Sequence, residues 1–255
     1  MRTQLRVLLQ RLLGTEGYLR LISRVYLTLV QAGLLREAYP ELFFVDRLVQ
    51  PGDVCLDIGA NLGYYTVQMG RRVGPTGQVW AVEPVPLFAR VLQANVERYQ
   101  LRQVQLVQKA LGVEPGVVQM ATPHVNGVFR HGLTQVVDEA TTSSRPVAQR
   151  YHVEMVNPAD YFDHLERLDF VKCDVEGYET VVLPALAPLL ERHRPVLQIE
   201  INTPEHRHAI LDLLAPLGYT PHRLLDHRLV PLDGRAYVQP AGHDVYFLPG
   251  PQDLL

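Results

Sequence analysis

The hydrophobic pattern changes at Asp53, where short apolar runs begin to alternate with stretches of helical periodicity. Five apolar runs predict strands: Val54–Asp57, Val79–Glu83, Val104–Val107, Phe170–Asp174 and Val196–Glu200. Helical spacing follows over Gly63–Val73 and Pro86–Tyr99, and again in the stretches that end at Arg192 and Leu214. This alternation predicts an α/β fold, a three-layer sandwich with helices on both faces of a parallel sheet. Ligands of such sheets bind beyond the carboxyl ends of the strands, so the residues that end strands are candidates for function.

The first fifty residues follow a different pattern. Leucines at helical spacing predict two short helices between residues 2 and 31, separated by a break at Gly14-Thr15. We expect residues 1–50 to form an N-terminal helical cap that packs on a main domain of residues 51–255. Because arginines strongly outnumber acids in these helices, contact with a membrane surface or an anionic partner is the alternative.

Two further regions interrupt the strand–helix rhythm. Gly112–Val153 contains prolines, glycines and polar residues. This composition predicts short strands and a mobile loop at which an acceptor could bind. Tyr219–Leu248 predicts antiparallel strands joined by a turn at Asp226-His227.

Composition narrows the class of protein. The chain has 255 residues and a net charge of −3, so it lacks the basic character of a nucleic-acid-binding protein. Cys55 and Cys173 lie in separate apolar runs, which indicates buried thiols in a reducing compartment. No apolar run is long enough to span a bilayer and no signal peptide is evident, so a cytoplasmic location is expected.

The most informative segment is DIGANLGYYT at residues 57–66, which predicts a strand, a tight turn and a helix. Gly59 and Gly63 let the backbone turn sharply and approach a ligand closely, and the helix N-terminus points into the same crevice. Asn61 stands where a dinucleotide fingerprint would have its second glycine. The turn therefore favours S-adenosylmethionine, whose ammonium Asp57 can bind and whose carboxylate the backbone N–H groups can hold.

A second acid ends the next predicted strand. Glu83 lies 20 residues beyond Gly63, a spacing that places its carboxylate near both hydroxyls of a ribose. The backbone at Ala110, after the third strand, would border the adenine. Tyr64 and Tyr65, at the start of the helix, complete the predicted donor site.

A third constellation concerns the methyl acceptor. Asp174 and Glu176 follow a buried strand and share a face if the chain stays extended, and Glu200 ends the neighbouring strand. A carboxylate here could take the proton of an acceptor hydroxyl, with Asp174 the first candidate and Glu176 the second. Alternatively, Asp174 and Glu200 could hold Mg²⁺. Among the histidines, His131 is the best alternative base, because it lies in the predicted acceptor loop.

Together these segments resemble the FkbM family of S-adenosylmethionine-dependent methyltransferases. The matching pieces are DIGANLGYYT at 57–66, AVEP at 81–84, KALG at 109–112, FVKCDVEGYE at 170–179 and LQIE at 197–200. The resemblance implies a class I methyltransferase, Rossmann-like fold, with a seven-stranded, mostly parallel sheet whose last strand is antiparallel. It also implies O-methylation of a natural product, sugar or glycan. A nicotinamide-dependent oxidoreductase and a catalytically inactive, methyltransferase-like binding module are the alternatives.

Overall fold

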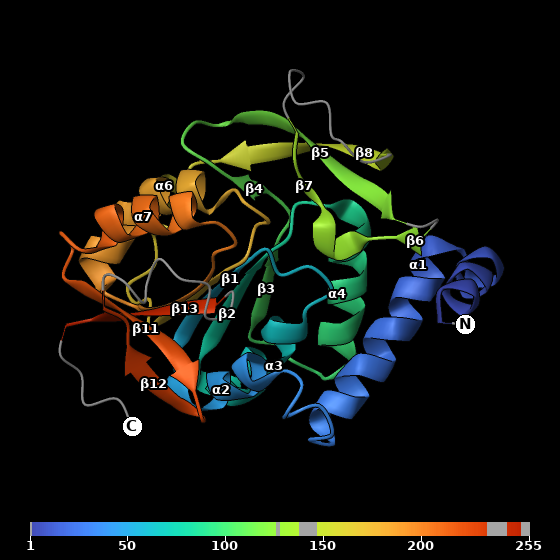
Figure 1. Ribbon diagram of the computed structural model, residues 1–255, viewed down its shortest axis with the longest axis horizontal. Coiled ribbons are helices and arrows are strands. Elements are labelled where there is room, and N and C mark those ends of the chain that lie inside the picture. Colours follow the sequence, from blue (N-terminus) through green and yellow to red (C-terminus); the bar gives the residue numbers. More distant parts are fainter. Residues whose placement is uncertain (1, 126–127, 138–146, 234–243, 251–255) are drawn as a thin grey trace.

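The computed structural model describes residues 2–125, 128–137, 147–233 and 244–250 (Figure 1). The α-helices are α1 (Arg2–Gln31), α2 (Pro40–Leu48), α3 (Tyr64–Val73), α4 (Pro86–Arg98), α5 (Pro158–Tyr161), α6 (Glu179–His193) and α7 (Pro204–Leu214). The strands are β1 (Val54–Ile58), β2 (Gln78–Val82), β3 (Val104–Val107), β4 (Ala110–Leu111), β5 (Gly116–Val125), β6 (Val128–Phe129), β7 (Gln135–Val136), β8 (Val147–Val156), β9 (Phe170–Cys173), β10 (Val196–Glu200), β11 (Tyr219–Leu225), β12 (Arg228–Pro231) and β13 (Asp244–Pro249).

The central sheet has eight strands in the order β12-β11-β13-β10-β9-β1-β2-β3. The predicted parallel core is confirmed: β10, β9, β1, β2 and β3 pair in parallel, and β13 is antiparallel to β10. The predicted strand number of seven is wrong, because β12 adds an eighth strand that also runs against the core. Its hairpin turn, Asp226-His227, has positive φ at both residues, which suits a tight two-residue connection between twisted strands.

Helices cover both faces of this sheet, as the alternating pattern predicts. Successive side chains of a strand point to opposite faces. Leu56 and Ile58 of β1 therefore pack in a cluster with α6 and α7, whereas Cys55 packs with α2 and α3. Both cysteines are buried free thiols. This arrangement leaves the carboxyl ends of the parallel strands free to form a site.

The segment between β3 and β9 forms a second sheet, in which β5 and β8 are ten-residue antiparallel strands and β4, β6 and β7 are short (Figure 1). The prediction of short strands and a loop is therefore wrong for the long strands β5 and β8, whereas β6 and β7 are short as predicted; residues 126–127 and 138–146 lie outside the described part. Tyr151 and Val153 are buried while His152 and Glu154 are exposed, the period of a half-buried strand. Pro123, which indicated a loop, lies at an irregularity in the pairing where a proline is tolerated.

The N-terminal residues form helix α1, which is kinked where the sequence predicts a break. Gly14 has φ 68° and ψ 171°, outside the helical region. After the kink, Tyr18 and Leu19 pack against α4 and the second sheet, and Leu27 packs against α3 and α4. Among the described helices, none is both long and apolar enough to cross a membrane.

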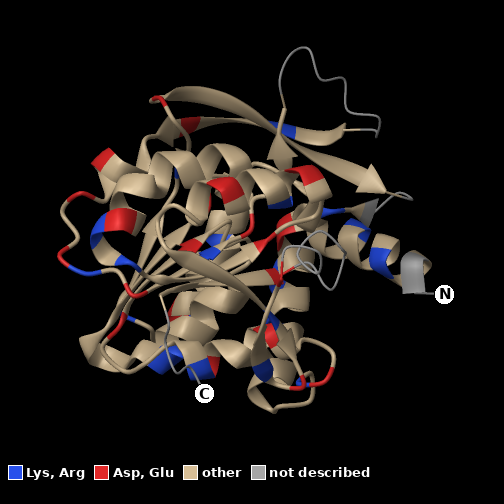
Figure 2. Ribbon diagram, turned by 60° about the vertical axis from the view of Figure 1, so that its left-hand side comes forward, with Lys and Arg blue, Asp and Glu red and all other residues tan. Residues whose placement is uncertain are grey.

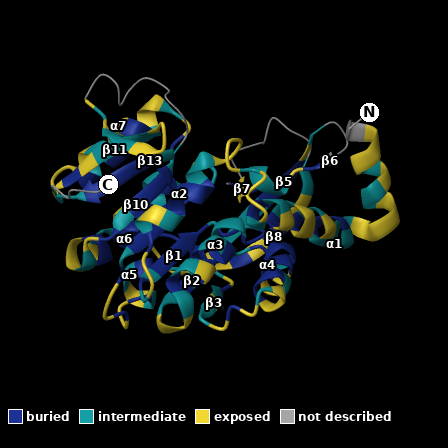
Figure 3. Ribbon diagram, turned by 90° about the horizontal axis from the view of Figure 1, so that it is seen from below, coloured by how far each residue is buried: buried dark blue, intermediate teal, exposed yellow. Residues whose placement is uncertain are grey.

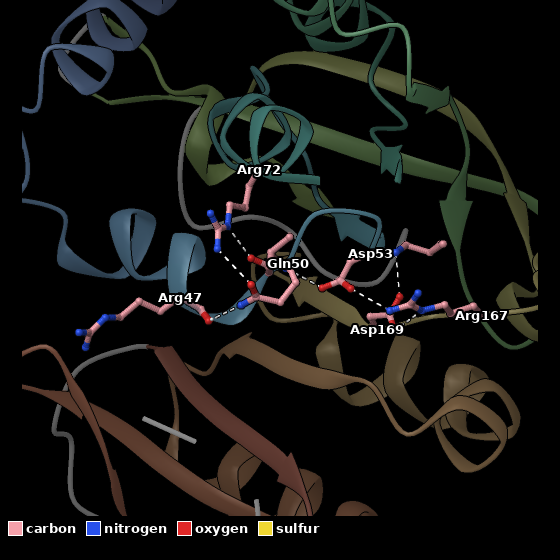
Figure 4. A network of polar contacts seen from close by, with 8 residues as sticks. Arg47, Gln50, Asp53, Arg72, Arg167 and Asp169 are labelled. Carbon is pink, nitrogen blue, oxygen red and sulfur yellow. Dashed lines mark hydrogen bonds and ion pairs between the residues drawn. The ribbon is translucent and has the colours of Figure 1, made fainter. Parts of the chain in front are cut away.

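A polar network fixes the amino ends of β1 and β9, away from the carboxyl ends (Figure 4). Arg167 donates from Nη2 to Asp53 Oδ1 at 2.9 Å and from Nε to Asp169 Oδ1 at 2.6 Å. Asp169 Oδ2 accepts from Val54 N–H at 2.8 Å, and Asp53 Oδ2 accepts from Gln50 N–H at 2.7 Å. These bonds join the two central strands at one end, and their oxygens are occupied by protein donors.

Candidate active site

A cavity of about 280 Å³ lies at the carboxyl ends of β1, β2 and β9. It is enclosed by the turn after β1, the start of α3, the loop after β9 and residues of the second sheet. The predicted site residues that line it are Asp57, Gly59, Asn61, Tyr64, Tyr65, Glu83, Ala110, His131, Asp174 and Glu176. Gly63 and Glu200 do not line the cavity, but they adjoin residues that do. The structure thus brings together residues from both halves of the domain.

The turn after β1 depends on Gly59. Its φ is +81°, and a Cβ added there would lie 1.8 Å from the backbone oxygen of Asp174. Gly59 N–H donates to Val82 O at 3.0 Å, so the ends of β1, β2 and β9 lie close together. Gly63 also has positive φ, and a Cβ there would lie 3.0 Å from the Leu92 side chain. Both glycines are therefore required by the backbone geometry of the turn.

Asp57 is buried at the end of β1. Thr66 of α3 donates its hydroxyl to Asp57 Oδ2 at 2.5 Å. Burial raises the pKa of Asp57 to about 6, although the hydrogen bond from Thr66 opposes this shift. An ammonium group bound in the cavity would stabilise the ionised form of this buried carboxylate.

Glu83, at the end of β2, is buried and carries two backbone hydrogen bonds. Its Oε2 accepts from Asn61 N–H and its Oε1 from Val85 N–H, both at 2.8 Å. Burial raises the pKa of Glu83 to about 7, with these two bonds opposing the shift. Each carboxylate oxygen retains a lone pair for a further donor, which is what binding of two ribose hydroxyls requires.

Asn61 joins the turn to the second sheet. It adopts a left-handed conformation with φ 50°, which asparagine tolerates better than most residues. Its Oδ1 lies 2.9 Å from His131 Nδ1, and its Nδ2 donates to His131 O at 3.4 Å. Burial, helped by Arg130, lowers the pKa of His131 to about 4, so the ring is neutral at physiological pH. His131 is thereby held beside the predicted donor turn.

Lys172 lies at the centre of the predicted acceptor side, and it is not among the site residues predicted from the sequence. The side chain is 2% exposed, and its Nζ lies 3.5 Å from Asp174 Oδ2 and 3.3 Å from Asp244 Oδ1. Nζ also lies 5.1 Å from the centre of the Tyr65 ring. Burial disfavours the ammonium, but Asp174 and Asp244 outweigh it and raise the pKa of Lys172 well above its usual value.

The missed residues differ in the signal that the sequence carries. Lys172 is a charged residue within a wholly buried strand, a pattern that by itself calls for a partner. Asp244 carries no such signal, because only the antiparallel pairing of β13 with β10 places it opposite Glu200. Gln198 of β10 is likewise joined to the site by tertiary structure, since its Nε2 donates to the Tyr65 hydroxyl at 3.2 Å.

The three predicted acids converge, and their ligand atoms lie within 4.8 Å of one another. Burial, and then a hydrogen bond with Asp174, raise the pKa of Glu200 to about 9. Burial opposes ionisation of Asp174, but Lys172 outweighs it and lowers the pKa of Asp174. Burial and the charge of Asp174 raise the pKa of Glu176 to about 7. At neutral pH Asp174 is therefore ionised, Glu200 keeps its proton, and Glu176 titrates.

These charges decide how well the cluster suits Mg²⁺. The number and type of oxygen ligands would be suitable for the ion. However, the Lys172 ammonium already lies beside Asp174, and a metal would have to displace the proton of Glu200. The donor set fits a carboxylate pair that shares one proton next to a lysine better than it fits a divalent cation.

The protein has a class I methyltransferase fold. The features that define it are the strand order, the antiparallel β13 between β10 and β11, the glycine turn and the acid that ends β2. The chain belongs to the FkbM methyltransferase family, because its residues 57–221 match the methyltransferase FkbM domain. The resemblance drawn from the motifs is thereby confirmed.

Individual relatives match different shares of the chain. The Sulfolobus acidocaldarius protein named "Probable cobalt-precorrin-6B C(15)-methyltransferase (decarboxylating)" is 32% identical over 77 residues, which are 30% of this chain and 38% of that protein. The protein-L-isoaspartate O-methyltransferase of Aeropyrum pernix is 40% identical over 55 residues, 22% of this chain and 21% of that protein. The crystal structure of methyltransferase FkbM from Methylobacillus flagellatus KT aligns with a TM-score of 0.48 and 17% identity, over 77% of this chain and 43% of that chain. In each case the chain spans less than half of the relative's length.

Proposed function

We propose that the protein is an S-adenosylmethionine-dependent methyltransferase that methylates a hydroxyl oxygen of a small molecule, sugar or glycan. The observation that carries the proposal is the cavity at the carboxyl ends of the strands, where the Gly59 turn, buried Asp57 and buried Glu83 face one enclosed space. The Gly59 backbone packs so closely on the Asp174 carbonyl that a side chain would not fit there, and the turn thereby holds the ends of β1 and β9 together beside the cavity. Family membership supports the same reaction class.

On the donor side, each residue would have a separate role. Glu83 would accept hydrogen bonds from the ribose hydroxyls, and Asp57 would bind the ammonium directly or through water. The backbone around Ala110, beside the cavity, would border the adenine. Asn61 and neutral His131 would hold the second sheet over the turn and exclude water. When bound, S-adenosylmethionine supplies the methyl group, which passes to the acceptor oxygen as its bond to sulfur breaks.

On the acceptor side, Glu176 is the best candidate for the general base. Its carboxylate lines the cavity, and a pKa of about 7 is close to the value at which a base is most effective at neutral pH. Asp174 is a weaker base because Lys172 stabilises its ionised form. We therefore assign to Asp174 the positioning of the acceptor hydroxyl, and to Glu176 the uptake of its proton.

Isothermal titration with S-adenosylhomocysteine tests the donor site. We expect binding to be lost in Glu83→Gln and kept in Glu191→Gln, because Glu191 is an exposed residue of α6. No binding by the unaltered protein would contradict the proposal. The same instrument with NADH addresses the oxidoreductase alternative, for which binding of NADH without S-adenosylhomocysteine is the expected result.

The acceptor is tested by incubation with S-adenosylmethionine and a panel of free sugars, glycans and small hydroxylated molecules, with intact-mass detection of an added methyl group. On any acceptor found, Glu176→Gln should lower kcat by about 10² to 10⁴-fold, the usual contribution of a general base. Its affinity for S-adenosylhomocysteine should remain, and Glu191→Gln should keep full activity. Binding without methylation of any acceptor would favour the inactive binding module.

Metal dependence is tested in the same assay. Activity should survive EDTA, because Lys172 supplies the positive charge beside Asp174. Loss of activity in EDTA with recovery on adding Mg²⁺ would instead show that Asp174, Glu176 and Glu200 hold the ion.

A further inference from the structure

The first segment of α1, residues 2–13 before the Gly14 kink, presents apolar side chains to solvent. Leu5 is 57% exposed, Leu8 is 53% exposed and Leu12 is 71% exposed. Their spacing of three and four residues places them on one face of the helix. Leu9, on the neighbouring face, packs against the cluster of α1, α4 and the second sheet, so the segment is anchored while its leucine face stays open.

Figure 3 shows this part of α1 as mostly exposed, at the edge of the molecule. Leu21 is 39% exposed and Val25 is 52% exposed, but the kink at Gly14 separates them from these leucines. Isolated exposed leucines are common on soluble proteins, but a row of them along a single helix marks an interaction surface. The α1 apolar face consists of Leu5, Leu8 and Leu12.

The charges beside this face indicate the partner. Residues 1–31 contain five arginines and a single glutamate, although the whole chain has a net charge of −3. Arg6 and Arg11 are exposed on the same segment as the leucines, and Figure 2 shows basic positions along α1. The glutamate, Glu16, is already paired with Arg20 and Arg90. Within the described part of the chain, Arg6 and Arg11 form no ion pair. A leucine face beside such arginines complements a membrane surface, which has an apolar interior and anionic headgroups.

The length of the segment fixes the mode of contact. Twelve helical residues extend about 18 Å, too short to cross a bilayer but sufficient to lie in its interface. We propose that the α1 apolar face docks on an anionic phospholipid bilayer, with the leucines inserted at the headgroup boundary and Arg6 and Arg11 contacting lipid phosphates. This surface is distinct from the cavity, so it does not depend on the proposed methyl transfer.

Vesicle flotation of the full chain tests the proposal. Vesicles of phosphatidylcholine mixed with phosphatidylglycerol should carry the protein, and vesicles of phosphatidylcholine alone should carry far less. The triple variant Leu5→Gln, Leu8→Gln, Leu12→Gln should lose about tenfold or more in binding, because each leucine removes apolar surface from water. Arg6→Gln with Arg11→Gln should weaken binding to anionic vesicles several-fold and remove much of its salt dependence.

The control replaces apolar residues that are equally exposed elsewhere. Leu34→Gln with Val117→Gln, at positions 71% and 70% exposed, should bind vesicles as the unaltered protein does. Circular dichroism and S-adenosylhomocysteine titration on every variant separate loss of docking from loss of fold or of the donor site. Equal binding by the leucine variant, or no binding by the unaltered protein, overturns the proposal. Light scattering that shows a dimer abolished by the leucine substitutions also overturns it, because a second copy would then cover the face.

Discussion

The two ends of strands β1 and β9 both carry carboxylates, but they use them differently. At the amino ends, Asp53 and Asp169 share the exposed Arg167 and also accept backbone N–H groups. At the carboxyl ends, Asp57 is buried with a threonine as its partner, and Asp174 lies beside the buried Lys172. The first arrangement satisfies its charges with protein donors. The second keeps charges that are only partly compensated, which is the condition for binding a charged ligand and moving a proton.

Burial raises carboxyl pKa values at both ends of the strands. At the amino ends burial raises the pKa of Asp53, while the Gln50 N–H and Arg167 oppose the shift. At the carboxyl ends the pKa values of Glu83 and Glu176 rise to about 7 and that of Glu200 to about 9. The difference teaches that burial alone does not distinguish the two ends. The two ends differ in the cation beside the carboxylates, which is the exposed Arg167 at the amino ends and the buried Lys172 at the carboxyl ends, and the following predictions test this difference.

Removing the buried cation should have the largest effect. Lys172→Met leaves the partly buried Asp174 and Asp244 without their shared ammonium, and the free energy of unfolding should fall by about 3 to 5 kcal/mol. Urea unfolding at neutral pH measures the change. A loss below about 1 kcal/mol would show that the two carboxylates are solvated in the folded protein.

Filling the glycine turn should be nearly as damaging. Gly59→Ala places a methyl group against the Asp174 carbonyl at a positive φ, and strain with overpacking should cost about 3 kcal/mol. Titration should detect no S-adenosylhomocysteine binding, even where urea unfolding shows a folded protein. Gly116→Ala, where a Cβ meets open space, is the control and should be neutral for binding. Retained binding by the Gly59 variant would mean that the turn does not shape the donor site.

The Glu83 carboxyl should make stability depend on pH. Its pKa is near 4.5 in the unfolded chain and about 7 in the folded protein, so the folded state binds the extra proton between these values. The free energy of unfolding should therefore fall, by roughly 2 kcal/mol, as the pH rises from 4.5 to 7. Unfolding in urea across this window should show a shallower fall in Glu83→Gln than in Glu191→Gln. Conversely, affinity for S-adenosylhomocysteine should rise through pH 7, because the ionised carboxylate accepts the ribose hydroxyls.

The smallest effect is expected at the amino ends. Arg167→Met removes the ion pairs with Asp53 and Asp169, but the arginine is 57% exposed, so the free energy of unfolding should fall by less than about 1 kcal/mol. Titration should show unchanged affinity for S-adenosylhomocysteine. A reduced affinity would mean that the two ends of the strands are coupled, and the contrast between them would fail.

The sequence predicts some regions of the fold correctly and others wrongly. The strand–helix core and the turn at residues 57–63 were predicted correctly, because buried periodicity and glycine geometry are local properties. The second sheet was mistaken for short strands and a loop, since Pro123 and nearby glycines were weighted above the alternation at Tyr151 and Val153. The hairpin of β11 and β12 was predicted from its turn at Asp226-His227, whereas the seven-stranded sheet that the family resemblance implies has one strand too few.

The amino-acid order alone determined the parallel core, the glycine turn and the acids that end the strands, since each depends on neighbours close in the chain. Only the tertiary structure decided how those acids are charged. Lys172, Asp244 and Glu200 come from three different strands, and burial with distance sets the proton positions among them. Electrostatic interactions depend on separation in space and on access to water, and neither quantity is written along the chain.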